Sequence, residues 1–436
     1  MVLLKSFTNI FRVPELRKRM LFTLGSLIIY RLGIIIPIVG VNVAMLGERL
    51  KQATGLGIFF SYFDTVSGSA LSQCTLFALG ISPYITASIA MQLLTMAIPQ
   101  LEQLQKEGDY GRKIINQYTR YLTLAVAFMS SVTYAIGLQA AGLVLQPGIG
   151  FLVLFVLSMT AGAMFIMWVG EQISLYGIGN GASVLIFAGI VSRLPDLVAR
   201  TVQYVKLGTT DIISVAIMLA FFILIVACIV YLEKGERKIP VQYARRIVGN
   251  RVYGGQNSYI PFKINPVGVM PVIFASAALN WPVIIANVLA AKFESLQFLK
   301  DIVNSRPVFL SMEFVLIIFF TFLYTALVFN PDELSENIKK NGGFIPGIRP
   351  GKKTALFFDY ILNRIGLVGA IYLGILAIVP DILRTIFDVP FMLSGVSLLI
   401  AVGVSLEISA QVETFLIEHR YEGFLSSGRV KNRMAR

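Results

Sequence analysis

The chain has 436 residues, of which 56% are hydrophobic and only 14% are charged, whereas a typical soluble domain has roughly 25% charged residues. This composition excludes an ordinary soluble globular protein. The formal net charge of +13 arises from 37 basic and 24 acidic residues. In a membrane protein the positions of Lys and Arg indicate which loops lie in the cytoplasm. The sequence predicts an all-α polytopic membrane protein.

Ten apolar segments are each long enough to cross ~30 Å of hydrocarbon as a helix of about 20 residues. They begin near Met20, Thr75, Tyr118, Gly150, Ser183, Ile212, Val267, Phe314, Ile365 and Leu393. The first is expected to remain as a span, since Arg31 interrupts it and no small-x-small cleavage motif follows. The predicted fold is therefore ten transmembrane helices.

The basic residues alternate strongly between the two sides of the predicted spans. Of the 37 Lys and Arg residues, 26 lie in the N-terminal segment, in every second loop and in the tail, while 9 lie in the opposite loops. Arg31 and Arg120 account for the rest. This bias predicts a multi-pass membrane protein with both termini in the cytoplasm.

The predicted organisation has four parts. Residues 1–19 form an amphipathic cytoplasmic segment, 20–205 an N-terminal half with spans one to five, 206–417 a C-terminal half with spans six to ten, and 418–436 a basic cytoplasmic tail. The C-terminal half carries two long basic loops, 233–266 and 330–364. These loops are the expected soluble face of the protein and suit an acidic partner such as ribosomal RNA.

Residues 57–72 predict a re-entrant half-helix that plugs a cavity. The apolar run Gly57–Gly68 is too short to cross the bilayer. Irregular backbone at membrane depth is tolerated only where protein or a water-filled cavity surrounds it. The expected plug residues are Phe60, Tyr62, Phe63, Asp64, Val66 and Gly68.

The next segment, Thr75–Ile98, is a full span that Gly80-Ile81-Ser82-Pro83 should kink. Ile81 and Ile85 lie one turn apart on one face. In most membrane helices such a pair is only packing. Here the surrounding stretch, Phe77–Leu94, resembles the second-helix signature of the SecY family of protein-conducting channels.

The resemblance to the SecY family extends over essentially the whole chain. Its strongest further motifs are Trp168–Ser183, Gly235–Arg246 and Gly342–Gly351. Ser82 in the kink and residues 64–74 depart from the family pattern, which leaves the packing of the plug open. The resemblance implies two inverted five-helix halves with an opening between spans two and seven, and an odd number of spans per half is consistent with inversion.

The resemblance also implies site residues. The expected pore ring consists of Ile81, Ile85, Ile186, Ile190, Ile273 and Ile400. The expected lateral gate toward lipid consists of Thr86, Gln92, Asn280 and Trp281, which without the resemblance would equally be ordinary interhelical polar contacts. The docking residues for a motor or ribosome are Arg245, Arg246, Arg251 and Arg349.

The implied activity is passage of unfolded secretory polypeptides across the cytoplasmic (inner) membrane, with lateral release of hydrophobic helices into the lipid bilayer. The implied partners are the SecA ATPase, the ribosome, signal sequences and the small subunits SecE and SecG. No nucleotide-binding motif is present, since Gly347–Lys353 has the wrong spacing for a phosphate-binding loop. The chain is therefore expected to need no cofactor or metal and to be driven by its partners.

Two other classes of function fit less well. An ion-coupled transporter usually holds acidic or histidine residues near the membrane midplane, whereas Arg31, Glu407 and Glu413 fall toward the ends of their spans. A membrane enzyme needs a catalytic constellation, but no H-E-x-x-H or G-x-S-x-G motif is present. No catalytic residue is predicted.

Overall fold

The computed structural model divides into two compact units. It describes residues 13–41, 70–71, 73–140, 142–208, 211–243, 246–248, 251–253, 257–279, 305–387 and 393–427, with single positions at 282, 286, 298, 302 and 303. The first unit comprises Met1–Pro195 with Val404–Arg436, and the second comprises Asp196–Gly403. The last helix of the chain contributes to both units, and the predicted halves 20–205 and 206–417 stay predictions.

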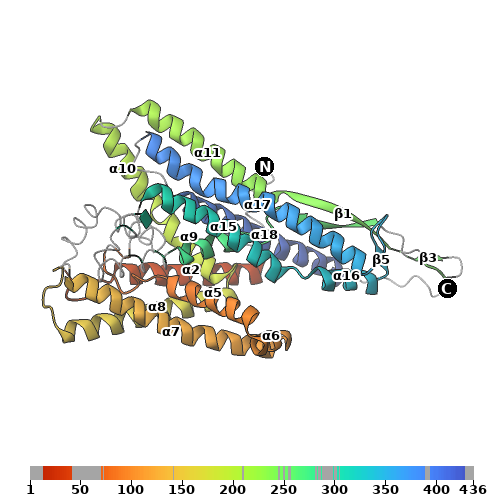
Figure 1. The fold of residues 1–436 in the computed structure, drawn as a ribbon, viewed down its shortest axis with the longest axis horizontal. Helices are drawn as coiled ribbons and strands as arrows, with labels where there is room; N and C mark the ends of the chain where they lie inside the picture. Colours follow the sequence, from red (N-terminus) through yellow and green to blue (C-terminus); the bar gives the residue numbers. More distant parts are fainter. Residues whose placement is uncertain are drawn as a thin grey trace. The chain divides into compact units, whose positions relative to one another are not determined.

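The first unit is built from helices. They are α2 (Pro14–Ile35), α5 (Ser82–Ala97), α6 (Pro99–Lys106), α7 (Asp109–Ala140), α8 (Ile149–Tyr176) and α9 (Gly181–Val191), together with the later part of α18 (Gly395–Ser427) (Figure 1). The later part of α18 belongs here because Ile408 and Phe415 pack against Leu16 and Ile178.

The second unit combines helices with a small sheet. Its helices are α10 (Leu194–Lys206, which begins just before the boundary), α11 (Ile212–Lys234), α12 (Met270–Ala278), α15 (Arg306–Val328), α16 (Pro331–Lys340), α17 (Lys352–Phe387) and the start of α18. Its strands are β1 (Glu236–Tyr243), β2 (Arg246–Val248), β3 (Arg251–Tyr253), β4 (Asn257–Lys263) and β5 (Gly343–Phe344). The strand order is β4-β1-β5, all antiparallel, and β2 pairs separately with β3.

Many of these helices are apolar enough to cross a membrane. Within the described ranges seven helices meet that requirement, or eight if α5 and α6, which meet at 101°, form one broken span. Each of the ten predicted spans coincides with a helix, but α12 is described only as far as Ala278 and the first turns of α2 are charged. The protein is thus a helical multi-pass membrane protein, and the count of ten spans stays a prediction.

Two prolines that were expected to disturb helices lie instead where helices begin. Pro83 and Pro271 occupy the first turns of α5 and α12, where proline's fixed φ is favourable and its missing N–H needs no intrahelical partner. The prediction that Pro83 kinks a helix running from Thr75 was therefore wrong. Residues 75–81 form turns, with Gly80 at φ 55°, and the helix starts at Ser82.

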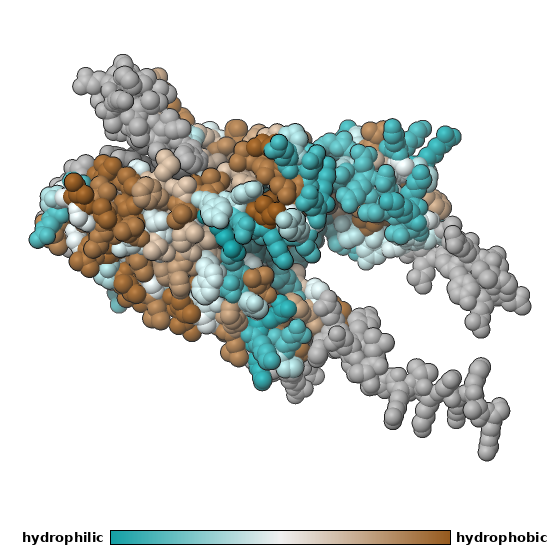
Figure 2. Space-filling model, turned by 90° about the horizontal axis from the view of Figure 1, so that it is seen from below, coloured by the Kyte–Doolittle hydropathy of each residue, from teal (hydrophilic) through white to brown (hydrophobic). Residues whose placement is uncertain are grey.

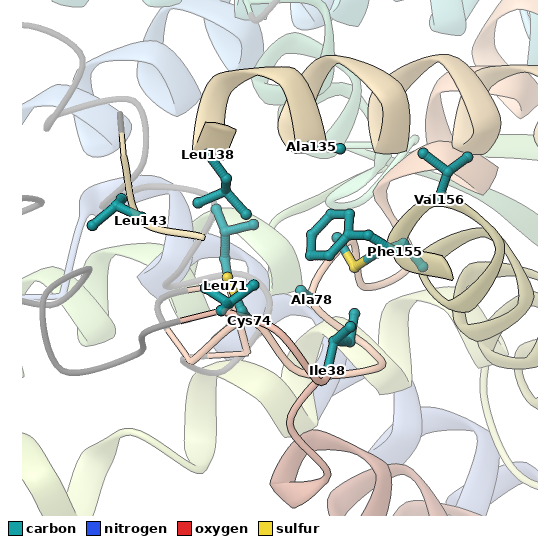
Figure 3. Packing of buried hydrophobic residues seen from close by; sticks show 11 residues of the cluster. Ile38, Leu71, Cys74, Ala78, Ala135, Leu138, Leu143, Phe155 and Val156 are labelled. Atoms are coloured by element: carbon teal, nitrogen blue, oxygen red, sulfur yellow. The ribbon is translucent and has the colours of Figure 1, made fainter. Parts of the chain in front are cut away.

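One core of the first unit surrounds this turn segment. It joins Leu138 of α7 and Phe155 of α8 to Leu71, Cys74 and Ala78 (Figure 3). Backbone bridges from Pro37 to Thr75 and from Val41 to Val144 tie the same region together. A non-helical stretch between membrane helices is thereby enclosed by protein, as the lack of water at that depth requires.

Candidate functional site

The turn segment before α5 is held by close approach to glycine residues. A Cβ atom added at Gly33 of α2 would overlap the ring of Phe77, and one added at Gly162 of α8 would overlap the carbonyl oxygen of Leu76. Phe77 also lies between aromatic rings, 6.3 Å from Tyr30 and 5.7 Å from Phe165 between ring centroids. The segment that follows the predicted plug is therefore locked in place.

This anchoring positions the first two residues of the predicted ring. Ile81 is the residue preceding α5, and its carbonyl accepts a hydrogen bond of 3.1 Å from the amide of Ile85. A Cβ atom at Gly170 of α8 would lie 3.2 Å from Ile81 Cδ1 and 3.4 Å from Leu185 Cδ1. Ile81 therefore packs beside α9, the helix that carries the next two ring residues.

The turn between α8 and α9 has its backbone amides bonded by side chains. Thr23 Oγ1 accepts from the amide of Ile178 at 3.1 Å, and Gln411 Oε1 accepts from the amide of Gly179 at 2.7 Å. Ser174 Oγ accepts from Gly181 at 2.8 Å, and Asn180 Oδ1 accepts from Ala182 at 3.1 Å. These contacts cap α9 and fix the direction in which Ile186 and Ile190 are presented.

The second unit holds the other two ring residues on α12 and α18. The amide of Ile273 bonds to the carbonyl of Val269 at 3.2 Å. A Cβ atom at Gly403 would overlap Cγ1 of Val269. Ile400 lies three residues before Gly403, so the start of α12 and the ring position of α18 belong to one close helix contact.

All six predicted ring isoleucines are buried, between 1% and 7% exposed. Four belong to the first unit and two to the second. The plug residues Phe60, Tyr62, Phe63, Asp64, Val66 and Gly68 lie outside the described residues. The ring and the plug therefore stay predictions.

The predicted lateral gate is described on one side only. Thr86 Oγ1 donates to the carbonyl of Ser82 within α5 at 3.0 Å. Gln92 is half-buried, and among the described residues its Oε1 atom finds no hydrogen-bond donor. Asn280 and Trp281 lie outside the described residues.

The two basic loops form one folded body, which was not predicted from the sequence. Strand β1 of the first loop pairs with β4 and also with β5 of the second loop. Beneath the strands, Ile239 and Val241 pack with Ile338, Ile345 and Phe358. The alternation of Ile239 and Val241 with exposed neighbours was the available signal. Hydrophilic residues cover the end of the second unit where β5 and α16 lie (Figure 2).

Arg349 is exposed on this body, and two hydrogen bonds hold the backbone of its loop, one at Arg349 and one at Gly351. Thr354 Oγ1 donates to the carbonyl of Arg349 at 3.0 Å, and Ser335 Oγ donates to the carbonyl of Gly351 at 2.8 Å. Arg246 and Arg251 lie on the short β2–β3 hairpin, and nothing is described of their side chains. Arg245 lies outside the described residues.

The structure adds a buried acid that the sequence interpretation missed. Glu313 of α15 is 4% exposed, but the eighth span was predicted to begin only at Phe314. Because α15 begins at Arg306, Glu313 lies inside the helix. Glu313 therefore has to be added to Arg31, Glu407 and Glu413, the ionisable residues that the sequence placed within the spans.

These features define a class: a polytopic helical membrane protein with a non-helical segment enclosed between its spans and a compact hydrophilic body formed by two of its loops. A family model described as SecY matches residues 75–409. The chain belongs to the SecY family.

Relatives match over nearly their full length. The chain is 42% identical over 425 residues to "Protein translocase subunit SecY" of Escherichia coli (strain K12), covering 96% of this chain and 95% of the relative. It is 42% identical over 442 residues to the protein of that name from Thermus thermophilus, covering 99% of this chain and 100% of the relative.

Solved structures show the same fold at low identity. One, described as "The structure of a protein conducting channel", has a TM-score of 0.62 at 19% identity and covers 91% of this chain and 92% of its own. Another, "Sec61 in the Canine ribosome-channel complex from the endoplasmic reticulum", has a TM-score of 0.59 at 18% identity, covering 91% and 92%. The fold is that of protein-conducting channels.

Proposed function

We propose that this chain is the channel subunit of a secretory translocase that passes unfolded polypeptides across the cytoplasmic membrane and releases hydrophobic helices sideways into lipid. The observation that carries the proposal is the relation to protein translocase subunits over 96% of the chain at 42% identity. A relation of that extent includes every segment to which a role is assigned below.

The ring supplies the barrier in this proposal. Ile81, Ile85, Ile186, Ile190, Ile273 and Ile400 line a narrow constriction. Branched apolar side chains at such a constriction exclude water and ions by dewetting. These side chains offer no polar group that would hold a passing polypeptide. In this proposal the ring therefore widens around the polypeptide without binding it and closes after it has passed. The six side chains are buried, which suits a closed constriction.

The plug, the gate and the orientation in the membrane follow from this role. The plug formed by residues 57–72 seals the outer side of the ring, and the fixed segment 73–81 anchors its end. We assign Thr86 and Gln92 to one side of the lateral gate and Asn280 and Trp281 to the other. The distribution of Lys and Arg, 26 against 9, supports placing both termini in the cytoplasm.

Energy comes from partners that dock on the cytoplasmic loops. We assign Arg245, Arg246, Arg251 and Arg349 to the binding of the SecA motor or the ribosome, because a guanidinium makes directional, bidentate contacts with carboxylates and phosphates. Small SecE and SecG subunits would brace the helices, and a signal sequence would favour the open gate by binding it better than the closed one.

The test is ion leakage through the resting channel. Replacing Ile81, Ile186 and Ile273 together with glycine should widen the ring and raise the resting conductance in planar bilayers. A matched control replaces Ile28, Ile213 and Ile223, which are 62%, 72% and 60% exposed, and should leave the bilayer sealed. If the ring variant conducts no more than the control, the ring assignment is wrong.

A further inference from the structure

Asn265 occupies the junction between the β1–β4 hairpin and α12. The hairpin leaves α11 at Gly235 and returns at Ile264, whose amide bonds to the carbonyl of Gly235 at 2.9 Å. Asn265 follows directly and is 2% exposed. All of these residues belong to the second unit.

The amide group of Asn265 joins two elements. Its Nδ2 atom donates to Glu233 Oε1 at 2.6 Å and to the carbonyl of Gly268 at 2.9 Å. Both partners are acceptors, so the NH₂ end must face them and the orientation of the amide is determined. A single side chain thus connects the last turn of α11 to the turn that begins α12.

The position of Glu233 in its helix explains why it accepts a hydrogen bond from Asn265. It is the penultimate residue of α11, where the negative end of the helix dipole disfavours a carboxylate. A charge-assisted hydrogen bond from a buried amide offsets that disadvantage.

The same turn is enclosed by two further helices. A Cβ atom at Gly369 of α17 would lie 2.6 Å from the carbonyl oxygen of Ile264, and one at Gly403 of α18 would overlap Val269. Val269 accepts hydrogen bonds from the amides of Val272 and Ile273 at 3.1 and 3.2 Å. A displacement of the turn would therefore reach Ile273 within one helical turn.

The other end of the amide is unsatisfied. Asn265 Oδ1 is buried and has no hydrogen-bond donor among the described residues. A buried acceptor without a partner is unfavourable, so among the described residues the bonds to Glu233 and Gly268 are what hold this side chain.

From this geometry we propose that Asn265 is a positioning residue that couples the β1–β4 hairpin to α12, so that a partner binding the hairpin moves Ile273. The inference rests on the proposed function. It separates two steps, docking on the hairpin and response of the ring, and assigns Asn265 to the second.

The experiment measures both steps in vesicles containing the purified channel with its small subunits. Flotation with the SecA motor reports docking, and ATP-driven import of an unfolded polypeptide reports the response. Asn265→Ala and Asn265→Asp should bind the motor as the wild type does, while import falls about tenfold, the effect of losing roughly one charge-assisted hydrogen bond. Asn116→Ala, at an exposed asparagine of α7, is the matched control and should change neither.

A reversed pair tests the link itself. In Asn265→Asp combined with Glu233→Gln, the new amide donates to the new carboxylate, which restores the link to α11 but not the bond to the carbonyl of Gly268. Import should therefore recover in part, at least about threefold relative to Asn265→Asp alone. If either single variant of Asn265 is unfolded, as judged by melting in detergent, the reversed pair is used in its place, because it restores the hydrogen bond between positions 265 and 233.

Other outcomes would overturn the inference. Loss of motor binding in Asn265→Ala would mean that the residue only maintains the hairpin, and normal import would mean that no coupling passes through it. Absence of rescue would exclude Glu233 as the route. If wild-type vesicles bind the motor but import nothing, the channel proposal fails and this inference fails with it.

Discussion

Glycine residues decide how closely the helices of the first unit approach the turn segment 73–81. Gly33 and Gly162 each lie where a Cβ atom would overlap an atom of that segment. Small residues allow such approach in membrane proteins, where packing rather than water release holds helices together. Neither glycine stands out in the sequence, because apolar spans contain many glycines and only the contact distinguishes them.

Gly162→Ala should destabilise the protein, since the added methyl group would press on the backbone carbonyl of Leu76, which has no rotamer to change. We expect a cost of about 1–3 kcal/mol, seen as a lower melting temperature in detergent. Gly137→Ala is the control. Gly137 lies in α7 with nothing within 4 Å of its Cβ position, so the change should be neutral or stabilising by up to about 1 kcal/mol. Equal melting temperatures for both variants would contradict the contact.

At the scale of elements, two loops predicted separately form one sheet. In β1, Gln242 and Tyr243 pair with Phe344 and Gly343, about 100 residues later in the chain. Pro240 pairs with β4 on one side and lies outside the β5 register on the other, the edge position that proline tolerates. The sheet therefore gives the loop of Arg349 a rigid base.

Arg349→Glu should abolish SecA-driven export while the protein still inserts and folds, because the exposed guanidinium is lost but the backbone contacts with Thr354 remain. Arg349→Lys should restore export only in part, since an ammonium group cannot form bidentate contacts. Arg112→Glu, at an exposed arginine of α7, is the charge-matched control. Export in cells and motor binding to vesicles are the measurements. Normal export from Arg349→Glu would show that this loop is a solvated connection.

At the scale of the whole molecule, the proposed lateral gate has Thr86 and Gln92 of α5 on one side and Asn280 and Trp281 on the other. Uncharged polar side chains suit such a gate, since they bond across it when closed and carry a smaller desolvation cost than charges when it opens.

A disulfide across the gate should block both functions of the channel. Thr86→Cys and Trp281→Cys, in a background of Cys74→Ser and Cys228→Ser, should crosslink in the resting channel and prevent secretion and helix insertion until reduced. Each single cysteine variant serves as a control and should stay active under oxidation. Full activity of the verified crosslinked protein would rule out the gate.

By itself the sequence was sufficient for the membrane class, the family and the approximate position of the helices, because hydropathy and short motifs are local properties. It also placed Ile81 and Ile85 one turn apart, since helical spacing is local. Only the structure showed that Pro83 starts a helix, that Glu313 is buried, that β1 pairs with β5 and that Asn265 joins α11 to α12. The pairing of β1 with β5 and the link made by Asn265 depend on contacts between segments apart in the chain, and a pattern within one segment does not identify its partner.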